Sequence, residues 1–122
     1  PEAWVRQGGR DLPLVQRLAS PKAMVLDVLS AQFRRRAERA GLPFNPAFAG
    51  AYDFTRAADF GGLMRGFLDG LPEGGLVMCH PGFVDEVLTG LDPMTAVRER
   101  EHAYLASDAF AQQLATSHVT LA

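Results

Sequence analysis

A histidine at the end of an apolar run is the residue of this chain best placed to do chemistry. His80 follows the apolar residues 75–79 and precedes Pro81-Gly82. Such a run between turns is typical of a strand buried on both faces of a parallel sheet. Ligands of parallel α/β proteins bind at the carboxyl ends of the strands, where an imidazole can act as acid, base or metal ligand. The alternative is a histidine that only caps the strand end through a backbone hydrogen bond.

The neighbours of His80 along the chain offer it few partners. Cys79 adjoins it, but successive side chains of a strand point to opposite faces, so we expect a small buried hydrophobe rather than a nucleophile. Asp85 and Glu86 follow across the turn and could orient the imidazole or bind a substrate hydroxyl; the alternative is two solvated loop acids. His80 and Asp85 could supply two metal ligands, whereas a closed site needs three or four. We therefore expect no complete metal site within these residues.

Apolar spacing and capping residues predict the elements that would hold these side chains. Ser20-Pro21 and three aspartates, Asp59, Asp92 and Asp108, are typical helix starts. We expect helices at residues 21–40, 59–69, 92–105 and from 108 onward, strands at 47–54, 75–80 and 119–121, and a loop from 81 to about 91. In the first helix an apolar stripe is predicted to face inward: Val25, Leu26, Leu29, Phe33, Ala37 and Ala40. Leu12, Leu14, Val15 and Leu18 could line a short turn before it.

Alternation of helices and strands predicts an α/β architecture with a mostly parallel sheet. About three strands are predicted, fewer than a parallel sheet usually has, and such a sheet would leave apolar strand faces uncovered. The chain also begins without a methionine. We therefore expect residues 1–122 to be part of a larger α/β domain.

Composition and charge argue against a disulfide-linked, a membrane-spanning and a nucleic-acid-binding protein. The 122 residues are 48% hydrophobic and 21% charged, which is ordinary for a globular protein, and one cysteine allows no intramolecular disulfide. No apolar run approaches the roughly 20 residues of a membrane span, and we expect a cytoplasmic protein. A net charge of −2 gives no overall field for nucleic acid.

Two charged clusters are predicted to be solvated surfaces. Arg34, Arg35, Arg36 and Arg39 lie on the polar side of the first helix, and contact with nucleic acid or phosphate is the alternative. Residues 98–101 alternate in sign and predict an ion-paired surface. Val97, Glu101, Tyr104 and Leu105 are expected on related faces of the same helix. His102 and His118 are also expected at the surface.

Several sequence segments, taken in order, resemble one enzyme family. Gly75-Leu-Val-Met-Cys-His80-Pro-Gly-Phe-Val-Asp85 is followed by Leu91-Asp-Pro and Arg98-Glu-Arg-Glu101. Together they resemble the ChbG/HpnK carbohydrate deacetylase family, also called YdjC-like. Phe48-Ala-Gly-Ala-Tyr52-Asp-Phe and the closing Val119-Thr-Leu-Ala are similar to its hopanoid-biosynthesis-associated branch. The resemblance covers nearly all of this chain but only the C-terminal part of the family.

The resemblance implies a TIM-barrel-like fold, of which this chain would be a part. It implies metal-dependent removal of an N-acetyl group from a small amino-sugar substrate. A divalent metal, Mg or Zn, would be held by an upstream Asp-Asp motif and two upstream histidines that these residues lack, so the fragment alone would be inactive.

By the same resemblance, His80 is the expected active-site residue. It would act as a general acid at the leaving amine or as a contact to the acyl oxygen. Asp85 would bind substrate or orient the imidazole, and Tyr52 and Phe83 could stack on a sugar ring; simple packing is the alternative for both rings. A non-catalytic module that assembles through an exposed sheet edge, for instance as a homo-oligomer, is the other function we consider.

Overall fold

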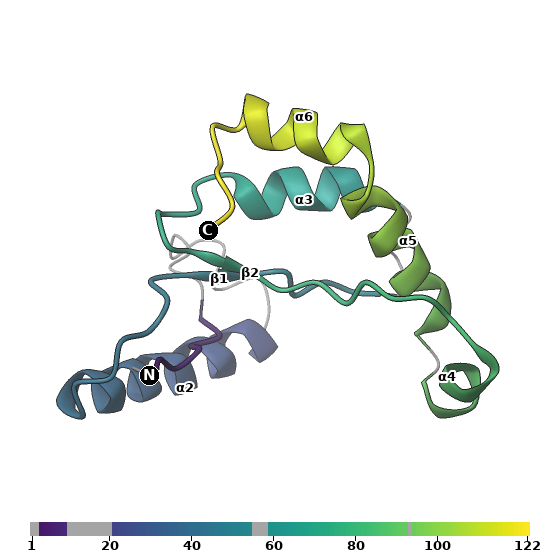
Figure 1. Ribbon diagram of the computed structural model, residues 1–122. Coiled ribbons are helices and arrows are strands. Elements are labelled where there is room, and N and C mark those ends of the chain that lie inside the picture. Colours follow the sequence, from purple (N-terminus) through teal and green to yellow (C-terminus); the bar gives the residue numbers. More distant parts are fainter. Residues whose placement is uncertain (1–2, 10–20, 55–58, 93) are drawn as a thin grey trace. The chain divides into compact units, whose positions relative to one another are not determined.

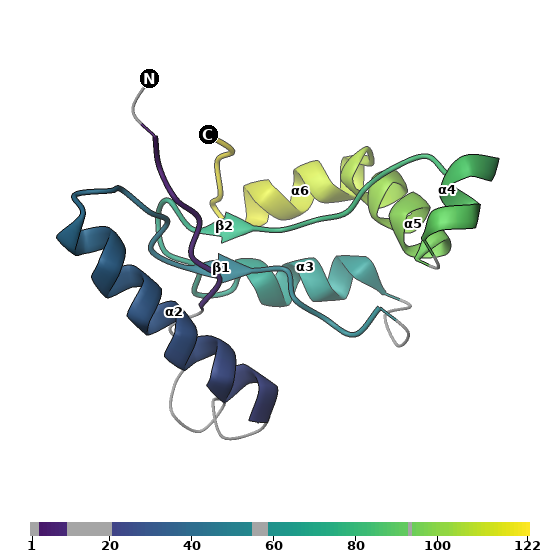
Figure 2. The ribbon, with the colours of Figure 1, turned by 90° about the horizontal axis from the view of Figure 1, so that it is seen from below.

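The described part of the chain is a mixed α/β structure. A computed structural model describes residues 3–9, 21–54, 59–92 and 94–122. In chain order it has helix α2 (Pro21–Arg39), strand β1 (Phe48–Ala49), helix α3 (Phe60–Leu68), strand β2 (Leu76–Val77), and helices α4 (Glu86–Leu91), α5 (Thr95–Leu105) and α6 (Asp108–Thr116) (Figure 1). The two strands pair in parallel (Figure 2). The predicted α/β class is thus confirmed, while the turn predicted near residues 12–18 lies outside the described residues.

The chain divides into two compact units, and the first comprises residues 1–49 and 71–77. In it Phe48 pairs with Leu76 and Ala49 with Val77. Residues 3–9, for which the sequence predicted no strand, run beside this sheet: Val5 forms an isolated parallel bridge with Phe44.

Buried amide side chains hold that segment in place. Gln7 is 1% exposed, and its backbone N–H donates to Asn45 Oδ1 at 2.9 Å. The Asn45 Nδ2 group donates to the carbonyls of Gln7 and Ala47 at 3.1 and 2.8 Å. Because buried polar groups must be hydrogen-bonded, this network specifies one path for residues 3–9.

The inward apolar stripe predicted for α2 is confirmed at Ala37 and wrong at three of its larger residues. Val25, Leu29 and Phe33 are exposed, while Ser30 and Ala37 are buried. Gly9 approaches the helix at Ser30 so closely that a Cβ on Gly9 would lie 2.6 Å from Ser30 Cβ. The chain therefore packs against a different face of α2, one that offers small side chains at the point of contact.

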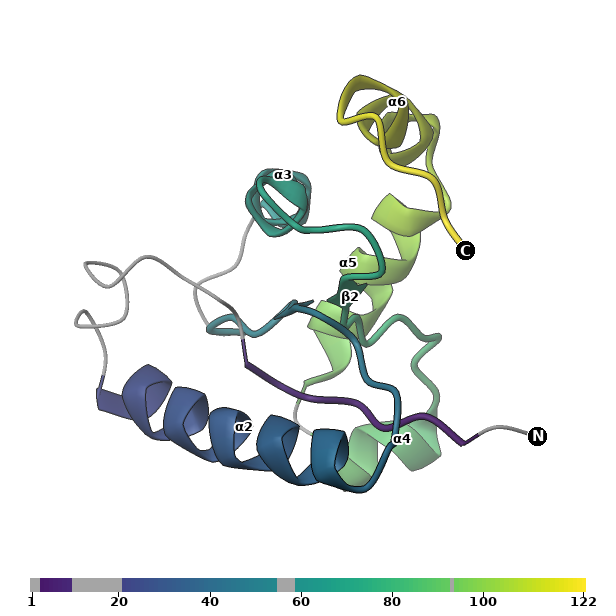
Figure 3. The ribbon, with the colours of Figure 1, turned by 90° about the vertical axis from the view of Figure 1, so that its left-hand side faces the viewer.

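The second unit, residues 50–70 and 78–122, is built around α3, α5 and α6. Asp59 caps α3 as predicted, since its Oδ1 accepts the Gly62 N–H at 2.9 Å. The apolar face of α3 is buried through Phe60, Met64, Phe67 and Leu68. Helix α6 lies beside α3 (Figure 1), and Figure 3 shows the two helices nearly end-on. The Tyr104 ring of α5 packs against Phe60 of α3 and Phe110 of α6, with ring centroids 5.6 and 5.7 Å apart.

Several predicted boundaries and caps differ from the structure. Helix α5 begins at Thr95 rather than at Asp92, because Asp92 ends α4 and its side chain accepts the Met94 N–H, and Ser107 rather than Asp108 is the N-cap residue of α6. Strand pairing covers two residues on each side, and Gly50, which follows β1, has a φ of +104° that breaks extended geometry. Residues predicted as loop form α4, because Asp85 Oδ1 accepts the Leu88 N–H at 2.8 Å and caps the helix. Residues 119–121 form no strand: the Val119 N–H bonds back to the Leu114 carbonyl at 2.9 Å and closes the end of α6.

None of the described helices is both long and apolar enough to span a bilayer.

Replacing Gly50 should destabilise the fold strongly. A Cβ there would lie 2.1 Å from the Met78 carbonyl oxygen, and the positive φ adds strain, so we expect Gly50→Ala to lower the free energy of unfolding by at least about 2 kcal/mol. Gly66 is the matched control: nothing lies within 4 Å of its added Cβ, and Gly66→Ala in α3 should stabilise by about 0.5–1 kcal/mol. Urea denaturation measures both; equal effects of the two substitutions would contradict the close approach at Gly50.

Candidate active site

A fully buried carboxylate lies at the centre of the candidate site. Glu101 of α5 is 0% exposed, so its predicted place on an ion-paired surface is wrong. Val97, one helical turn earlier, is the other buried residue of α5. That spacing was the signal in the sequence that could have identified Glu101 as inward-facing.

Each oxygen of this carboxylate accepts a hydrogen bond from a distant segment. The Tyr52 hydroxyl donates to Glu101 Oε1, and the backbone N–H of His80 donates to Oε2. The His80 Nδ1 atom lies 3.9 Å from Oε1. The structure therefore brings together two predicted site residues, Tyr52 and His80, through a third that sequence reasoning missed.

The segments that carry these donors follow the two strands. Phe48 pairs with Leu76, and the same spacing along the chain separates Gly50 from Met78 and Tyr52 from His80. The close approach of Gly50 to the Met78 backbone keeps the two segments adjacent. His80 thus lies just beyond a parallel strand, where the sequence predicted it, although that strand is shorter than expected.

Burial and the Glu101 charge raise the pKa of two neighbouring side chains, the Tyr52 phenol and the Cys79 thiol. The pKa of Tyr52 is raised strongly, first by burial of the phenol, then by its hydrogen bond to Glu101 and the carboxylate charge. Burial also raises the pKa of the half-buried Cys79 to about 11, with the Glu101 charge adding to it. A thiol with this pKa is a poor nucleophile at neutral pH, in agreement with the packing role predicted for Cys79.

The His80 imidazole is partly accessible. Its side chain is 23% exposed, and its ring lies edge-on to Phe54 with centroids 5.3 Å apart. The Nδ1 atom is buried and has no hydrogen-bond partner among the described residues. The ring therefore has one buried nitrogen that faces Glu101, while part of the side chain remains open to a ligand.

Tyr52 sits in an aromatic cluster rather than on an open surface. Its ring centroid lies 4.6 Å from that of Phe54, 5.9 Å from that of Phe60 and 6.1 Å from that of Phe67. This packing favours the alternative considered for Tyr52, in which the ring is part of the core. Its hydroxyl donates to Glu101.

Two predicted site residues lie in the segment that leads into α4. Asp85 is exposed and caps α4, and no described contact joins it to His80. Phe83 is 79% exposed, and its ring centroid lies 4.4 Å from that of His102. Phe83 thus presents an accessible aromatic face, while Asp85 has a structural task that the sequence did not predict.

An ion pair holds the start of α5. Asp92 Oδ2 accepts from Arg98 Nε at 3.0 Å and Nη2 at 2.6 Å, and the Asp92 Oδ1 atom accepts the Met94 N–H at 2.8 Å. The Met94 and Arg98 hydrogen bonds lower the pKa of Asp92, with smaller effects of the Arg98 and His80 charges. The Arg98 carbonyl in turn accepts the Gly82 N–H at 3.2 Å and ties the segment after His80 to α5.

Within residues 3–9, 21–54, 59–92 and 94–122, no three His, Cys, Asp or Glu side chains are grouped closely enough to hold a metal ion. The side chains around His80 therefore do not themselves fit a metal site.

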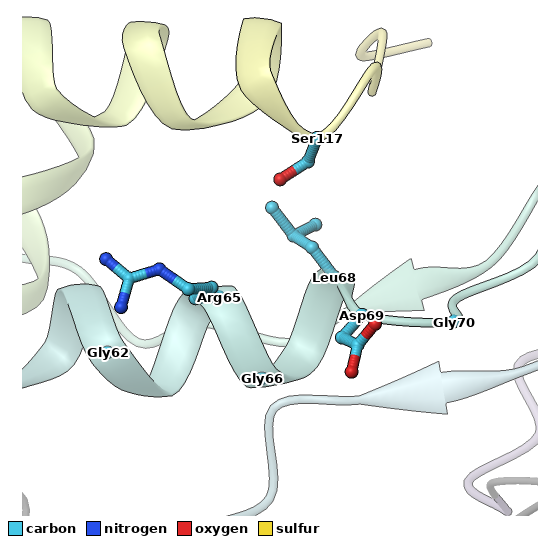
Figure 4. A pocket seen from close by; sticks show the side chains of 7 residues that line it. All are labelled: Gly62, Arg65, Gly66, Leu68, Asp69, Gly70 and Ser117. Atoms are coloured by element: carbon cyan, nitrogen blue, oxygen red, sulfur yellow. The ribbon is translucent and has the colours of Figure 1, made fainter.

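A separate pocket of about 540 Å³ opens between α3 and the end of α6 (Figure 4). It is lined by Gly62, Arg65, Gly66, Leu68, Asp69, Gly70 and Ser117. Its polar groups comprise one guanidinium, one carboxylate and one hydroxyl, with no imidazole. The buried carboxylate and the accessible histidine offer more chemistry, so we place the candidate active site there.

The chain belongs to the YdjC-like family: residues 2–116 match the family model described as YdjC-like protein. The resemblance inferred from the segments around His80 is thus confirmed at the level of the family, and membership fits a carbohydrate deacetylase-like function. No curated protein and no solved structure is detectably similar to the chain.

Alkaline titration should report the buried hydroxyl of Tyr52. The chain has two tyrosines, and the pKa of both Tyr52 and Tyr104 is raised in the folded protein, chiefly by burial. Their contribution to stability should be complete below about pH 10, the ordinary tyrosine pKa, and lost as the pH rises further, since the unfolded chain then releases protons that the folded chain retains.

We therefore expect phenolate absorbance to appear at higher pH in the folded protein than in the denatured one. Tyr52→Phe should remove the later-ionising component. A folded protein whose two tyrosines both titrate near pH 10 would contradict the burial of Tyr52 against Glu101.

Proposed function

We propose that this chain is the C-terminal part of a metal-dependent deacetylase that removes an N-acetyl group from an amino sugar, with His80 as the proton donor to the leaving amine. Family membership supports the reaction class. The observation that carries the proposal is the position of His80: its backbone is anchored to the buried Glu101 carboxylate, and its imidazole is partly accessible.

Hydrolysis of an amide needs a proton for the departing nitrogen, because an amine anion is too basic to leave. An imidazole is suited to this task, since it gains and loses a proton near neutral pH. Anchoring of the His80 backbone limits the movement of its ring, and a positioned acid is more effective than a freely moving one. These features favour His80 as the general acid over a role as a contact to the acyl oxygen.

The substrate roles of the other predicted residues remain part of the proposal. The exposed ring of Phe83 supports stacking against a sugar face. Asp85 would bind a substrate hydroxyl in addition to capping α4. Tyr52 would contribute through the hydroxyl that it shares with Glu101 rather than through a free ring face.

The finer features of the proposal rest on the sequence segments quoted above. They are a TIM-barrel-like domain of which residues 1–122 form the C-terminal portion, the hopanoid-associated branch of the family, and a cytoplasmic location. A divalent metal, Mg or Zn, is also proposed. Because the described side chains do not fit a metal site, its ligands would have to lie elsewhere, and we assign these residues no step that involves it.

His80→Ala in the intact enzyme should reduce turnover of an N-acetyl amino sugar by about 100-fold or more, because the leaving amine loses its proton donor. Acetate release measures the effect. His118→Asn is a matched control: His118 is exposed at a φ of +53°, a conformation that asparagine tolerates, and its replacement should leave turnover unchanged. Near-normal activity of His80→Ala would rule out the role assigned to His80.

A second candidate function, association with another chain, is favoured by apolar side chains on the surface. Val25, Leu29 and Phe33 are exposed on α2, as are Val87 and Leu91 on α4. Such residues often mark contact surfaces. If they do so here, we expect a homo-oligomer in size-exclusion chromatography with light scattering; a monomer at all concentrations tested would argue against this function.

A further inference from the structure

We propose that Glu101 is the positioning residue of His80: its carboxylate makes Nδ1 the nitrogen that carries the proton in the neutral imidazole, so that Nε2 is the nitrogen that takes up the second proton, and the resulting imidazolium donates that proton to the leaving amine. This inference rests on the proposed function of His80 and adds to it a residue and a tautomer.

The first support is the unused hydrogen-bonding capacity of Glu101. A carboxylate has about four acceptor positions, and in the described structure Tyr52 and the His80 backbone occupy one on each oxygen. Glu101 is 0% exposed. A buried acceptor is most stable when donors within the protein surround it.

The second support is the environment of His80 Nδ1. This atom is buried, lacks a hydrogen-bond partner among the described residues, and lies 3.9 Å from Glu101 Oε1. An unsatisfied nitrogen and an acceptor with spare capacity therefore face each other. The pairing satisfies both groups if the proton is on Nδ1, whereas a proton on Nε2 would place the lone pair of Nδ1 against the carboxylate.

The separation exceeds hydrogen-bond range by about 1 Å. Hydrogen bonds between catalytic groups are often long in the free enzyme and shorten when substrate binds. Glu101 Oε2 accepts the backbone N–H of His80, so the approach of Nδ1 that the inference requires is a movement of the imidazole relative to an anchored backbone.

Asp92 is the competing carboxylate, since the His80 charge contributes to its lowered pKa. Asp92 already accepts three hydrogen bonds, from the Met94 N–H and from Arg98 Nε and Nη2, whereas Glu101 accepts two in the described structure. Glu101 is therefore the better partner for Nδ1, and Asp92→Asn provides a control. A second control is Glu99→Gln, which alters an exposed glutamate of the same helix.

NMR of the intact protein labelled with ¹⁵N in its histidines tests the inference, because imidazole ¹⁵N shifts and couplings identify the protonated nitrogen. At about pH 8.5, where imidazoles are ordinarily neutral, we expect His80 to be the Nδ1–H tautomer in the wild type. In Glu101→Gln it should shift towards Nε2–H. Asp92→Asn and Glu99→Gln should keep the wild-type tautomer.

Kinetics distinguish positioning from simple structural support. Glu101→Gln should lower kcat for acetate release at least about tenfold with KM nearly unchanged. A wild-type protein with His80 in the Nε2–H form, or an unchanged tautomer in Glu101→Gln, would overturn the inference. If Glu101→Gln does not fold, the wild-type tautomer alone decides. If the intact wild-type enzyme released no acetate from N-acetyl amino sugars, the proposed function would be refuted. The tautomer result for His80 would still stand.

Discussion

The second unit depends on a carboxylate that has been removed from water. Glu101 is tolerated at 0% exposure because hydrogen-bond donors reach it from other segments: the hydroxyl of Tyr52 after β1 and the backbone of His80 after β2. Loss of either donor would leave a buried acceptor unsatisfied. The same interaction therefore holds three segments of the chain together and places the one accessible imidazole of the site.

The surrounding packing supports this arrangement in two ways. Gly50 lets two chain segments approach more closely than any side chain would allow, so that Tyr52 and His80 reach the same carboxylate. The Tyr52 ring, whose hydroxyl donates to the carboxylate, packs against Phe54 and Phe60, and Glu101 is fully buried. Exclusion of water strengthens the interactions of the carboxylate and accounts for the raised pKa of the Tyr52 phenol.

Family membership and geometry contribute different parts of the functional argument. The YdjC-like match fits a carbohydrate deacetylase-like function, whereas the hydrogen bonds around Glu101 show how the backbone of His80 is held. The residues around His80 do not fit a metal site by themselves. The metal requirement and the role of His80 are therefore separate proposals, and each can fail without the other.

Features that depend on neighbouring residues could be predicted from the order of amino acids. These include α3 with its Asp59 cap and apolar face, the α/β class, the family, and the position of His80 after an apolar strand. Only the tertiary structure decided that Glu101 is buried, because its donors are 49 and 21 residues away along the chain. It likewise decided which face of α2 is covered and that residues 119–121 close a helix. Periodicity and caps act within a few residues, whereas the burial of a charge depends on partners that only the folded chain brings near.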